Sequence, residues 1–450
     1  LLLLLTTFGL HTSIVKHLAE FRANNQHSKL AWAFKSISVY RIVSSFFLAG
    51  ILYFSADLLA RIYFKNALAA PVLKVFSFTI IFIVIIAIFS SLFNGLQNML
   101  RLALITFSEK FFFLISFIIL MLVSTHKNVL LAAYALLFGS IVTSLVFFPL
   151  ILKYGRLWQK SLDQSLHKKE LLQKITSFGF AAFLISLGNL IIGYLDTIIL
   201  TYFRPLSEVG IYNIVLPTVL IVGFLGRSIS QVFFPMVSEF KAKKLYHQLN
   251  QGLSLLHNYS LLIIIPLAVI MFVFPEFIIS LLFGQEYLGG TLAMKILSIG
   301  VIFFIIGTID QSVISGIGKP RTLTKILFIA SIFNIVANVI LIPVWGMNAA
   351  ALTTTISYFL IMGLSLNSLN KNLQFKIGIS KWVKFFLLAL ILTVFMQLIK
   401  MLIENPYLSF FTSLVLGAFF YLILAMTLKV FNLKEFKLIM RNIMNKKEKH

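Results

Sequence analysis

Residues 71–97 read PVLKVFSFTIIFIVIIAIFSSLFNGLQ, and Lys74 is the one charged residue among them. Crossing a hydrocarbon core of about 30 Å takes about 20 apolar residues in a helix. The segment must be helical because lipid offers the backbone N–H and C=O groups no other partners. The stretch therefore predicts a membrane-spanning helix.

Eleven further stretches of this kind follow the same rule. The composition agrees, with 60% hydrophobic and 12% charged residues, whereas soluble domains carry about 25% charged residues. We expect an all-α polytopic membrane protein with 12 full transmembrane helices plus an apolar stub at residues 1–18. The expected spans are 37–58, 71–97, 104–124, 129–152, 175–201, 209–237, 254–283, 291–316, 323–343, 347–369, 383–403 and 408–430.

The basic residues that produce the net charge of +24 are distributed unequally between the two sides of the membrane. Alternate connections place 30 of the 38 Lys and Arg residues on one side of the membrane and 7 on the other. Because Lys and Arg accumulate in cytoplasmic loops, the basic side and the C-terminus are predicted to be cytoplasmic. The predicted location is the cell (plasma or inner) membrane, and the charge indicates topology rather than nucleic-acid binding.

The chain also contains an internal repeat. Residues 19–22, AEFR, recur as residues 238–241, SEFK, at an offset of 219. The matched helices run in the same direction because six spans separate them, which predicts two pseudo-symmetric six-helix lobes related by an axis along the membrane normal. Further equivalent pairs are Asp57 and Glu276 at the same offset, and Lys74 and Lys295, and Gly95 and Gly316, at an offset of 221.

The repeat and the spans divide the chain into five expected parts. These are an N-lobe at 1–152, a basic cytoplasmic linker at 153–174, a C-lobe at 175–369, an extra transmembrane helix pair at 383–430 and a basic cytoplasmic tail at 431–450. By the offset of 219, the N-lobe is expected to lack its first helix and the start of its second.

Three groups of motifs in the second half carry a resemblance to a known family. They are Tyr194-Leu195-Asp196-Thr197 through Glu208-Val209-Gly210-Ile211-Tyr212-Asn213 with Leu216-Pro217; Phe234-Pro235-Met236-Val237-Ser238-Glu239; and Gly316-Ile317-Gly318-Lys319-Pro320 through Asn334, Asn338, Leu341-Ile342-Pro343, Gly346 and Asn348-Ala349-Ala350-Ala351. With these motifs the chain resembles the polysaccharide-export flippases, which carry O-antigen and other oligosaccharide repeat units, of the multidrug/oligosaccharidyl-lipid/polysaccharide (MOP) exporter superfamily.

The resemblance implies a transporter rather than an enzyme, and it implies no cofactor. Its expected activity is to move polyprenyl-diphosphate-linked oligosaccharide repeat units from the inner to the outer leaflet by alternating access, for cell-surface polysaccharide biosynthesis. The partners it implies are membrane lipids, the lipid-linked oligosaccharide, a polysaccharide polymerase and glycosyltransferases. Because the sequence shows no ATPase domain, an ion gradient or removal of the product would drive the transfer.

Three charged residues within the spans are the leading site candidates. A charge at mid-membrane depth costs roughly 2.5–3.5 kcal/mol on insertion scales, so each is expected to face a partner or a wet cavity. Arg227 is either a contact for the diphosphate, since guanidinium binds phosphate bidentately, or the partner of Asp310 in a structural ion pair. Asp196 and Asp310 are the candidates for coupling to H⁺ or Na⁺, or for ion pairing.

Secondary candidates lie nearer the ends of the spans. Lys16, Lys74 and Lys295 are further candidate diphosphate contacts; for Lys74 and Lys295 the alternative is an anchor whose ammonium group reaches the interface, and for Lys16 it is a topology charge. Pro217 and Pro235 each delete an intrahelical hydrogen bond, which makes them hinge candidates or the cause of static bends.

The remaining composition excludes several chemistries. Cysteine is absent and the eight His residues form no HExxH or other metal-like cluster, so no thiol nucleophile or metal site is predicted. A multidrug/cation antiporter of the same superfamily remains the first alternative function. A membrane polysaccharide polymerase or glycosyltransferase is the second, although the outer loops are short for such an active site.

Overall fold

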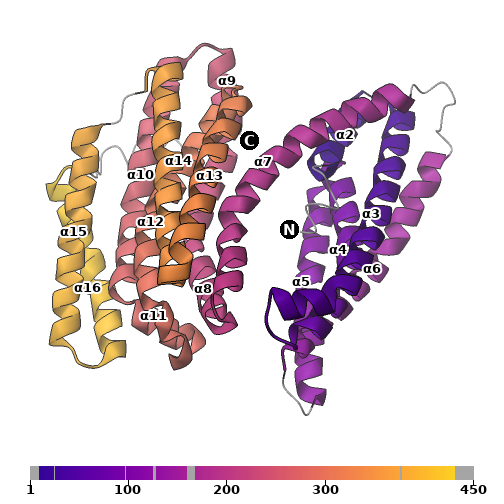
Figure 1. Cartoon of the computed structure of the whole chain (residues 1–450). Helices are drawn as coiled ribbons and strands as arrows, with labels where there is room; N and C mark the ends of the chain where they lie inside the picture. The colour runs from indigo at the N-terminus through magenta and orange to yellow at the C-terminus, as the bar shows by residue number, and fades with distance from the viewer. Residues whose placement is uncertain are drawn as a thin grey trace. The chain divides into compact units, whose positions relative to one another are not determined.

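The computed structural model of this 450-residue chain describes residues 10–24, 26–96, 98–124, 128–159, 168–375 and 378–430. Within these ranges the regular elements are helices, with no strand, so the all-α prediction is confirmed. The chain forms two compact units, Leu1–Leu190 and Ile191–His450 (Figure 1).

In the first unit, α4 lies among four other helices. It contacts α2, α3, α5 and α6, and a helix that is apolar on every face can pack on such neighbours or face lipid. Its residues Val84, Leu92 and Phe93 are buried. The helices are α2 (Leu10–Ala23), α3 (His27–Ile62), α4 (Ala69–Gly95), α5 (Met99–Val123) and α6 (Val129–Gln159), and α7 (Lys168–Phe203) contains the boundary between the units.

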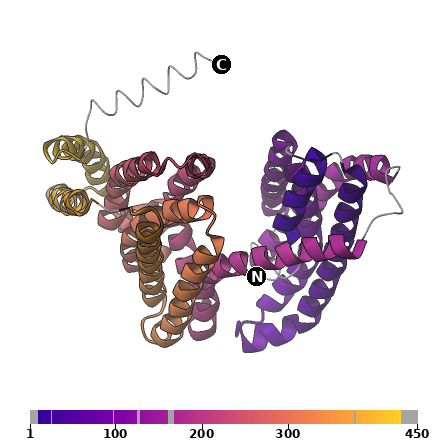
Figure 2. The ribbon, with the colours of Figure 1, turned by 90° about the horizontal axis from the view of Figure 1, so that it is seen from above.

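In the second unit, α12 takes the corresponding central place. It contacts α8, α9, α10, α13 and α14, and α15 and α16 pack against each other at one side of the unit (Figure 2). The elements are α8 (Leu206–Leu220), α9 (Gly223–Ala242), α10 (Tyr246–Val273), α11 (Pro275–Phe283), the 3₁₀ helix η1 (Gln285–Gly290), α12 (Thr291–Gly316), α13 (Pro320–Trp345), α14 (Met347–Leu373), α15 (Ile379–Leu402) and α16 (Pro406–Thr427).

Local sequence signals fix several helix ends. Asn98 caps α5 by accepting a hydrogen bond from the backbone N–H of Arg101 at 3.1 Å. Asn405 caps α16 in the same way, accepting from the N–H groups of Tyr407 and Leu408, and Pro406 occupies the first helical position. Both positions follow the usual preference for Asn as N-cap and Pro immediately after it.

The number of spans differs from the expected 12. Among the described residues, ten helices are long and apolar enough to cross a membrane, or eleven if α8 and α9 count as one bent span. The expected span 209–237 is broken after Leu220, and the expected span 254–283 is broken at Phe274 because α11 begins with Pro275. The count of 12 is therefore not confirmed, although the polytopic helical architecture is.

Other expected boundaries fall inside helices or outside the described residues. Helix α6 continues to Gln159 and α7 begins at Lys168, so both ends of the expected linker 153–174 are helical. The centre of that linker, residues 160–167, and the expected tail 431–450 lie outside the described residues, as do residues 1–9 of the expected stub.

The two units repeat a close helix contact at the offsets found in the sequence. A Cβ atom added at Gly95 of α4 would lie 2.7 Å from the Leu18 side chain and 3.3 Å from the carbonyl oxygen of Val15. A Cβ atom at Gly316 would lie 2.7 Å from the Val237 side chain and 3.3 Å from the carbonyl oxygen of Phe234. Leu18 and Val237 differ by 219, as do Val15 and Phe234, and the glycines differ by 221.

Polar contacts repeat in the same way. Lys74 pairs with Asp57 at 2.9 Å and Lys295 pairs with Glu276 at 3.5 Å. At the other end of these helices, Arg22 donates to the carbonyl oxygen of Leu96. Its counterpart Lys241 donates to that of Ile317 at 2.5 Å. The internal repeat is therefore a repeat of contacts within each unit, and not only of sequence.

Candidate functional site

A buried carboxylate, Asp196 of α7, forms the centre of the most extensive polar cluster in the second unit. Its side chain is fully buried. Asn338 of α13 donates to Oδ1 at 2.5 Å, Tyr212 of α8 donates to Oδ2 at 3.0 Å, and Thr354 of α14 also donates to Oδ2. The carboxylate thus joins four helices through hydrogen bonds that all run toward it.

The cluster extends along α13. The Asn338 amide also donates to Oδ1 of Asn334 at 3.1 Å, and Oδ1 of Asn338 accepts from the Thr353 hydroxyl. Among the described residues, the hydrogen-bond partners of Asp196 are neutral groups. Since an isolated buried charge is far more costly than a paired one, this carboxylate requires a proton or a bound cation to balance it.

A turn at Gly346 positions the cluster. Gly346 has φ +57° and ψ −135°, a conformation that side chains other than glycine rarely adopt. The Glu208 carboxylate accepts from the N–H of Met347 at 2.6 Å and from Arg204 at 2.9 Å. This turn ties the start of α14, which carries Thr353 and Thr354, to the corner between α7 and α8.

A second buried pair joins α10 to α12. Nε2 of His257 lies 2.7 Å from Oδ1 of Asp310, and both side chains are almost completely buried. The rings of Phe375 and Trp382 lie edge-on to the imidazole, with centroids 5.6 and 6.1 Å away. Among the described residues the partner of Asp310 is therefore His257 and not Arg227, so the ion-pair alternative for Arg227 does not describe this structure.

Arg227 lies on α9 with an exposed side chain. Its guanidinium carbon is 5.9 Å from the centroid of the Phe304 ring, a cation–π contact. The Phe304 ring lies 4.9 Å from that of Tyr358, and Tyr358 is within electrostatic reach of both Arg227 and Asp196. Phe304 thus contacts both Arg227 and the buried Tyr358.

The helix that carries Arg227 follows a break. Helices α8 and α9 form a span bent by 47°, and Pro217 precedes this break by one turn. After it, Gly223 and Gly226 allow α9 to approach α12, since added Cβ atoms would lie 2.7 Å from Phe304 and 2.8 Å from Ile305. The second hinge candidate, Pro235, lies within the unbroken α9.

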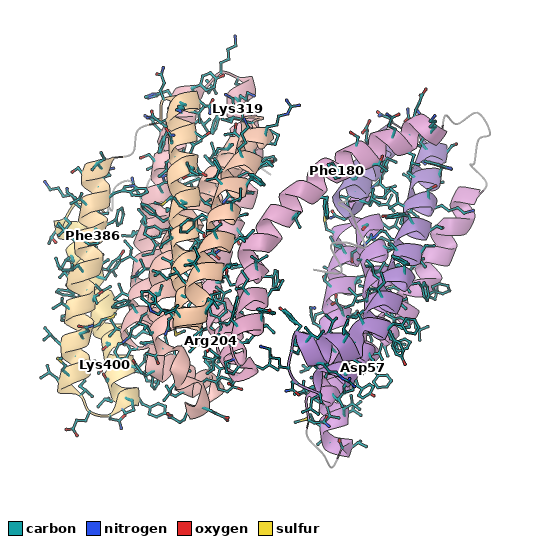
Figure 3. The ribbon with its side chains drawn as sticks, viewed as in Figure 1. Asp57, Phe180, Arg204, Lys319, Phe386 and Lys400 are labelled. Atoms are coloured by element: carbon teal, nitrogen blue, oxygen red, sulfur yellow. The ribbon has the colours of Figure 1, made fainter. Side chains whose placement is uncertain are left out.

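The lysine candidates are not brought together with Arg227 in any described contact. Lys74 and Lys295 form the ion pairs with Asp57 and Glu276, and Lys400 adds a second cation to Glu276 at 3.1 Å. Figure 3 shows Arg204 and Lys400 at one end of the second unit and Lys319 at the opposite end. Lys16 lies in α2, and its side chain is outside the described part of the structure.

Three groups of buried polar residues were hard to recognise from the sequence alone. His257 is one of eight scattered His residues, and its partner Asp310 lies 53 residues further along the sequence. Thr353 and Thr354 lie in an unremarkable TTT run. Arg41 belongs to the basic residues that the loop pattern assigns to the cytoplasmic side, although it lies inside the expected span 37–58. In the structure only 1% of it is exposed, within α3.

Comparison with known proteins first defines the class of protein. The structure of a lipid II flippase, MurJ, in an inward closed conformation is similar over 94% of this chain and 90% of its own, with a TM-score of 0.72 and 18% identity. An inward-facing MATE multidrug transporter of the MOP superfamily is similar over 83% and 88%, with a TM-score of 0.65 and 15% identity. The fold is therefore that of MOP superfamily transporters.

Sequence comparison then gives the family. The profile described as "Polysaccharide biosynthesis protein" matches residues 1–241 and the profile MatE matches residues 181–340. Because the first match covers more than half of the sequence, the chain belongs to the polysaccharide biosynthesis protein family, which confirms the resemblance found in its motifs.

Two relatives illustrate the range of the family. An uncharacterized membrane protein of Methanocaldococcus jannaschii is 29% identical over 99% of this chain and 90% of its own. A probable low-salt glycan biosynthesis flippase of Haloferax volcanii is 25% identical over 53% of this chain and 48% of its own.

Proposed function

We propose that this protein is a flippase that moves polyprenyl-diphosphate-linked oligosaccharide repeat units from the inner to the outer leaflet by alternating access. Family membership supports this proposal, as do relatives and structural neighbours named as a glycan biosynthesis flippase and a lipid II flippase. Its expected place is in cell-surface polysaccharide biosynthesis, alongside a polymerase and glycosyltransferases. The proposed orientation has the C-terminus in the cytoplasm.

The observation that carries the proposal is the environment of Arg227. The guanidinium is exposed on the second unit, and among the described residues it contacts the Phe304 ring rather than a carboxylate. A mid-span cation that is exposed in this way needs a polar environment, because lipid would impose a high cost. A water-filled cavity that admits a diphosphate supplies that environment, and guanidinium suits phosphate bidentately.

The test is leaflet transfer of a fluorescent polyprenyl-diphosphate glycan by the reconstituted full-length protein. Arg227→Ala is expected to slow transfer about 10- to 100-fold, since hydrogen bonds to charged groups contribute about 1.5–3 kcal/mol. Arg227→Lys should retain part of the rate because the positive charge remains, although the two-point hydrogen bonding of the guanidinium is lost. Arg321→Ala, which removes an exposed arginine from the start of α13, is the matched control; normal transfer by a well-folded Arg227→Ala protein contradicts the proposal.

Ion coupling is assigned to the Asp196 cluster. The carboxylate is balanced by H⁺ or Na⁺ in some states of the cycle, and Tyr358 links the cluster electrostatically to Arg227. Asp310, paired with His257, is the second ion-coupling candidate. In this scheme the break after Pro217 allows α9, with Arg227, to move relative to α8.

The lysines have more limited proposed roles. Lys74 and Lys295 can meet the diphosphate at the outer leaflet only after separating from Asp57 and Glu276. Lys16 is proposed as a contact for the diphosphate on the cytoplasmic side.

Cation antiport is the second candidate function. The MatE profile covers residues 181–340, which contain Asp196, Arg227 and Asp310. An antiporter would export a cationic dye against a Na⁺ or H⁺ gradient and would not need Arg227. Dye export by the Arg227→Ala protein, together with absence of glycan transfer by the wild type, would favour this function.

A further inference from the structure

A buried arginine in the first unit lies outside the site described above. Arg41 is 14 residues into α3, which places it about 21 Å along the helix from His27 at a rise of 1.5 Å per residue. Only 1% of the residue is exposed. Arginine is almost never buried so completely unless it is paired.

One edge of this guanidinium has no partner. Nη1 donates to the Ser91 hydroxyl at 3.1 Å and to the Ala87 carbonyl oxygen at 3.4 Å. Nε and Nη2 have no hydrogen-bond partner in the part of the chain that the structure describes. These two nitrogens present parallel N–H bonds along one edge, and that edge binds a carboxylate or phosphate through two hydrogen bonds.

The described carboxylates of the first unit form no ion pair with Arg41. Asp57 pairs with Lys74, and Glu109 pairs with Lys110. The hydrogen bonds of Arg41 go to neutral groups on α4. The cation is therefore buried without a counter-charge of its own.

The second unit has different buried ionisable groups at the place equivalent to Arg41. The offset of 219 carries Arg41 to Ser260 on α10, and α10 and α12 correspond to α3 and α4. There the buried ionisable groups are His257 and Asp310, which form a pair containing both a base and an acid. The repeat thus supplies an internal partner in one unit and leaves the corresponding centre of the other cationic.

A cavity lies beside this centre. Ile37, one turn before Arg41 on the same face of α3, and Tyr40 line a cavity of about 580 Å³ within the first unit. Three hydroxyl-bearing residues, Ser36, Tyr40 and Thr176, line it together with Trp32 and Phe180, the last of which is labelled in Figure 3. A mainly apolar space with three hydroxyl-bearing residues in its wall therefore lies along α3, within one helical turn of Arg41 in the sequence.

We propose that Arg41 is an oxyanion-binding residue of the first unit, and that its free guanidinium edge takes the diphosphate of the lipid-linked substrate when α3 and α4 separate around Ser91. The oxyanion site rests on the geometry of Arg41. The choice of diphosphate as its ligand rests on the proposed function, because a phospholipid headgroup offers the same phosphate chemistry.

The test measures binding to the full-length protein in phosphatidylcholine nanodiscs, with a fluorescent polyprenyl diphosphate as the probe. Arg41→Met is expected to weaken binding about 10- to 100-fold, the range for a lost charge-assisted contact. Arg41→Lys should weaken it less, because the charge remains while the two-point edge is lost. Arg61→Met, an exposed arginine on the same helix, is the matched control and should bind within about twofold of the wild type, as expected for an exposed site away from the ligand.

Competitors separate the two sources of phosphate. Inorganic pyrophosphate should displace the probe from the wild type, whereas phosphatidylglycerol in the nanodisc should not. If phosphatidylglycerol displaces it as well as pyrophosphate does, the diphosphate assignment is overturned in favour of a lipid headgroup.

Equal affinity of the wild type and a folded Arg41→Met protein overturns the oxyanion site altogether. If Arg41→Met does not fold, Arg41→Lys is the deciding variant. An affinity of Arg41→Lys for the probe equal to that of the wild type would likewise overturn the oxyanion site. Binding is measured without transfer between leaflets, so normal Arg41-dependent binding by a protein that moves no glycan would contradict the proposed function and leave the site intact.

Discussion

Replacing Asp196 separates its structural contribution from its role in ion coupling. Asp196→Asn keeps the shape and one acceptor oxygen. The amide can occupy the place of Oδ2, because the hydroxyls of Tyr212 and Thr354 that now donate to it can turn and accept instead. We therefore expect the Asn variant to fold with a stability within about 1 kcal/mol of the wild type, since the number of hydrogen bonds is kept.

Asp196→Leu is the contrasting variant. It leaves one N–H of Asn338, whose amide keeps its hydrogen bond to Asn334, and the hydroxyls of Tyr212 and Thr354 without their present acceptor in a buried cluster. Each such group costs about 1–3 kcal/mol, so the three together should destabilise the protein by roughly 3–9 kcal/mol. This difference between Asn and Leu tests the hydrogen-bond geometry before any transport is measured.

The ion dependence then tests coupling. A cation at 100 times its dissociation constant stabilises the folded state by about 2.7 kcal/mol. The wild type should gain thermal stability either as Na⁺ replaces choline or as the pH falls, and Asp196→Asn should lose that response together with leaflet transfer. An Asn variant that keeps both the ion response and transfer would refute the coupling role, and one that is as unstable as the Leu variant would refute the hydrogen-bond reasoning.

Two further predictions concern stability. Gly346→Ala places a Cβ atom 1.8 Å from Oε1 of Glu208 at a residue with φ +57°. The backbone strain of about 1–3 kcal/mol and the disturbed carboxylate contact should lower the melting temperature of the full-length protein. An unchanged melting temperature would contradict the turn geometry. At Glu276, on α11 outside the candidate spans, partial burial acts to raise the pKa, but the residue's own backbone N–H and the cations Lys400 and Lys295 outweigh it and lower the pKa. The resulting stabilisation is present above about pH 4.5, the ordinary pKa of Glu, and is lost as the pH falls through the lower pKa of the folded protein. Glu276→Gln should remove this part of the acid dependence, which is worth about 0.2–1 kcal/mol for exposed pairs. Melting curves recorded from pH 3 to 7 measure the difference.

The sequence suggests part of the candidate site. Asp196, Arg227 and Asp310 are candidates because charge is costly at mid-span depth, a rule that needs no contact information. Their partners are not predictable from the sequence, since helices in one bundle can pair in many ways. For Asp310 the structure gives His257 as the partner and not Arg227.

The repeat shows the same division. An offset near 220 residues was visible because duplicated helices keep small residues and charges at packing positions. Which contacts those residues make appeared only with the fold: Gly95 against Leu18, and Gly316 against Val237. The pairing of Lys74 with Asp57 likewise needs two helices to lie side by side.

By itself, the sequence determined that the chain is a helical membrane protein with a repeated plan, because hydrophobicity along the chain decides which segments enter lipid and lipid forces them to be helical. It also determined which residues are too polar for their depth. Only the tertiary structure decided which groups surround those residues: neutral hydrogen-bond donors at Asp196, His257 at Asp310, and no carboxylate among the described residues at Arg41. The physical reason is that charge compensation depends on separations of a few ångströms between residues far apart in the chain, and helix packing alone sets those separations.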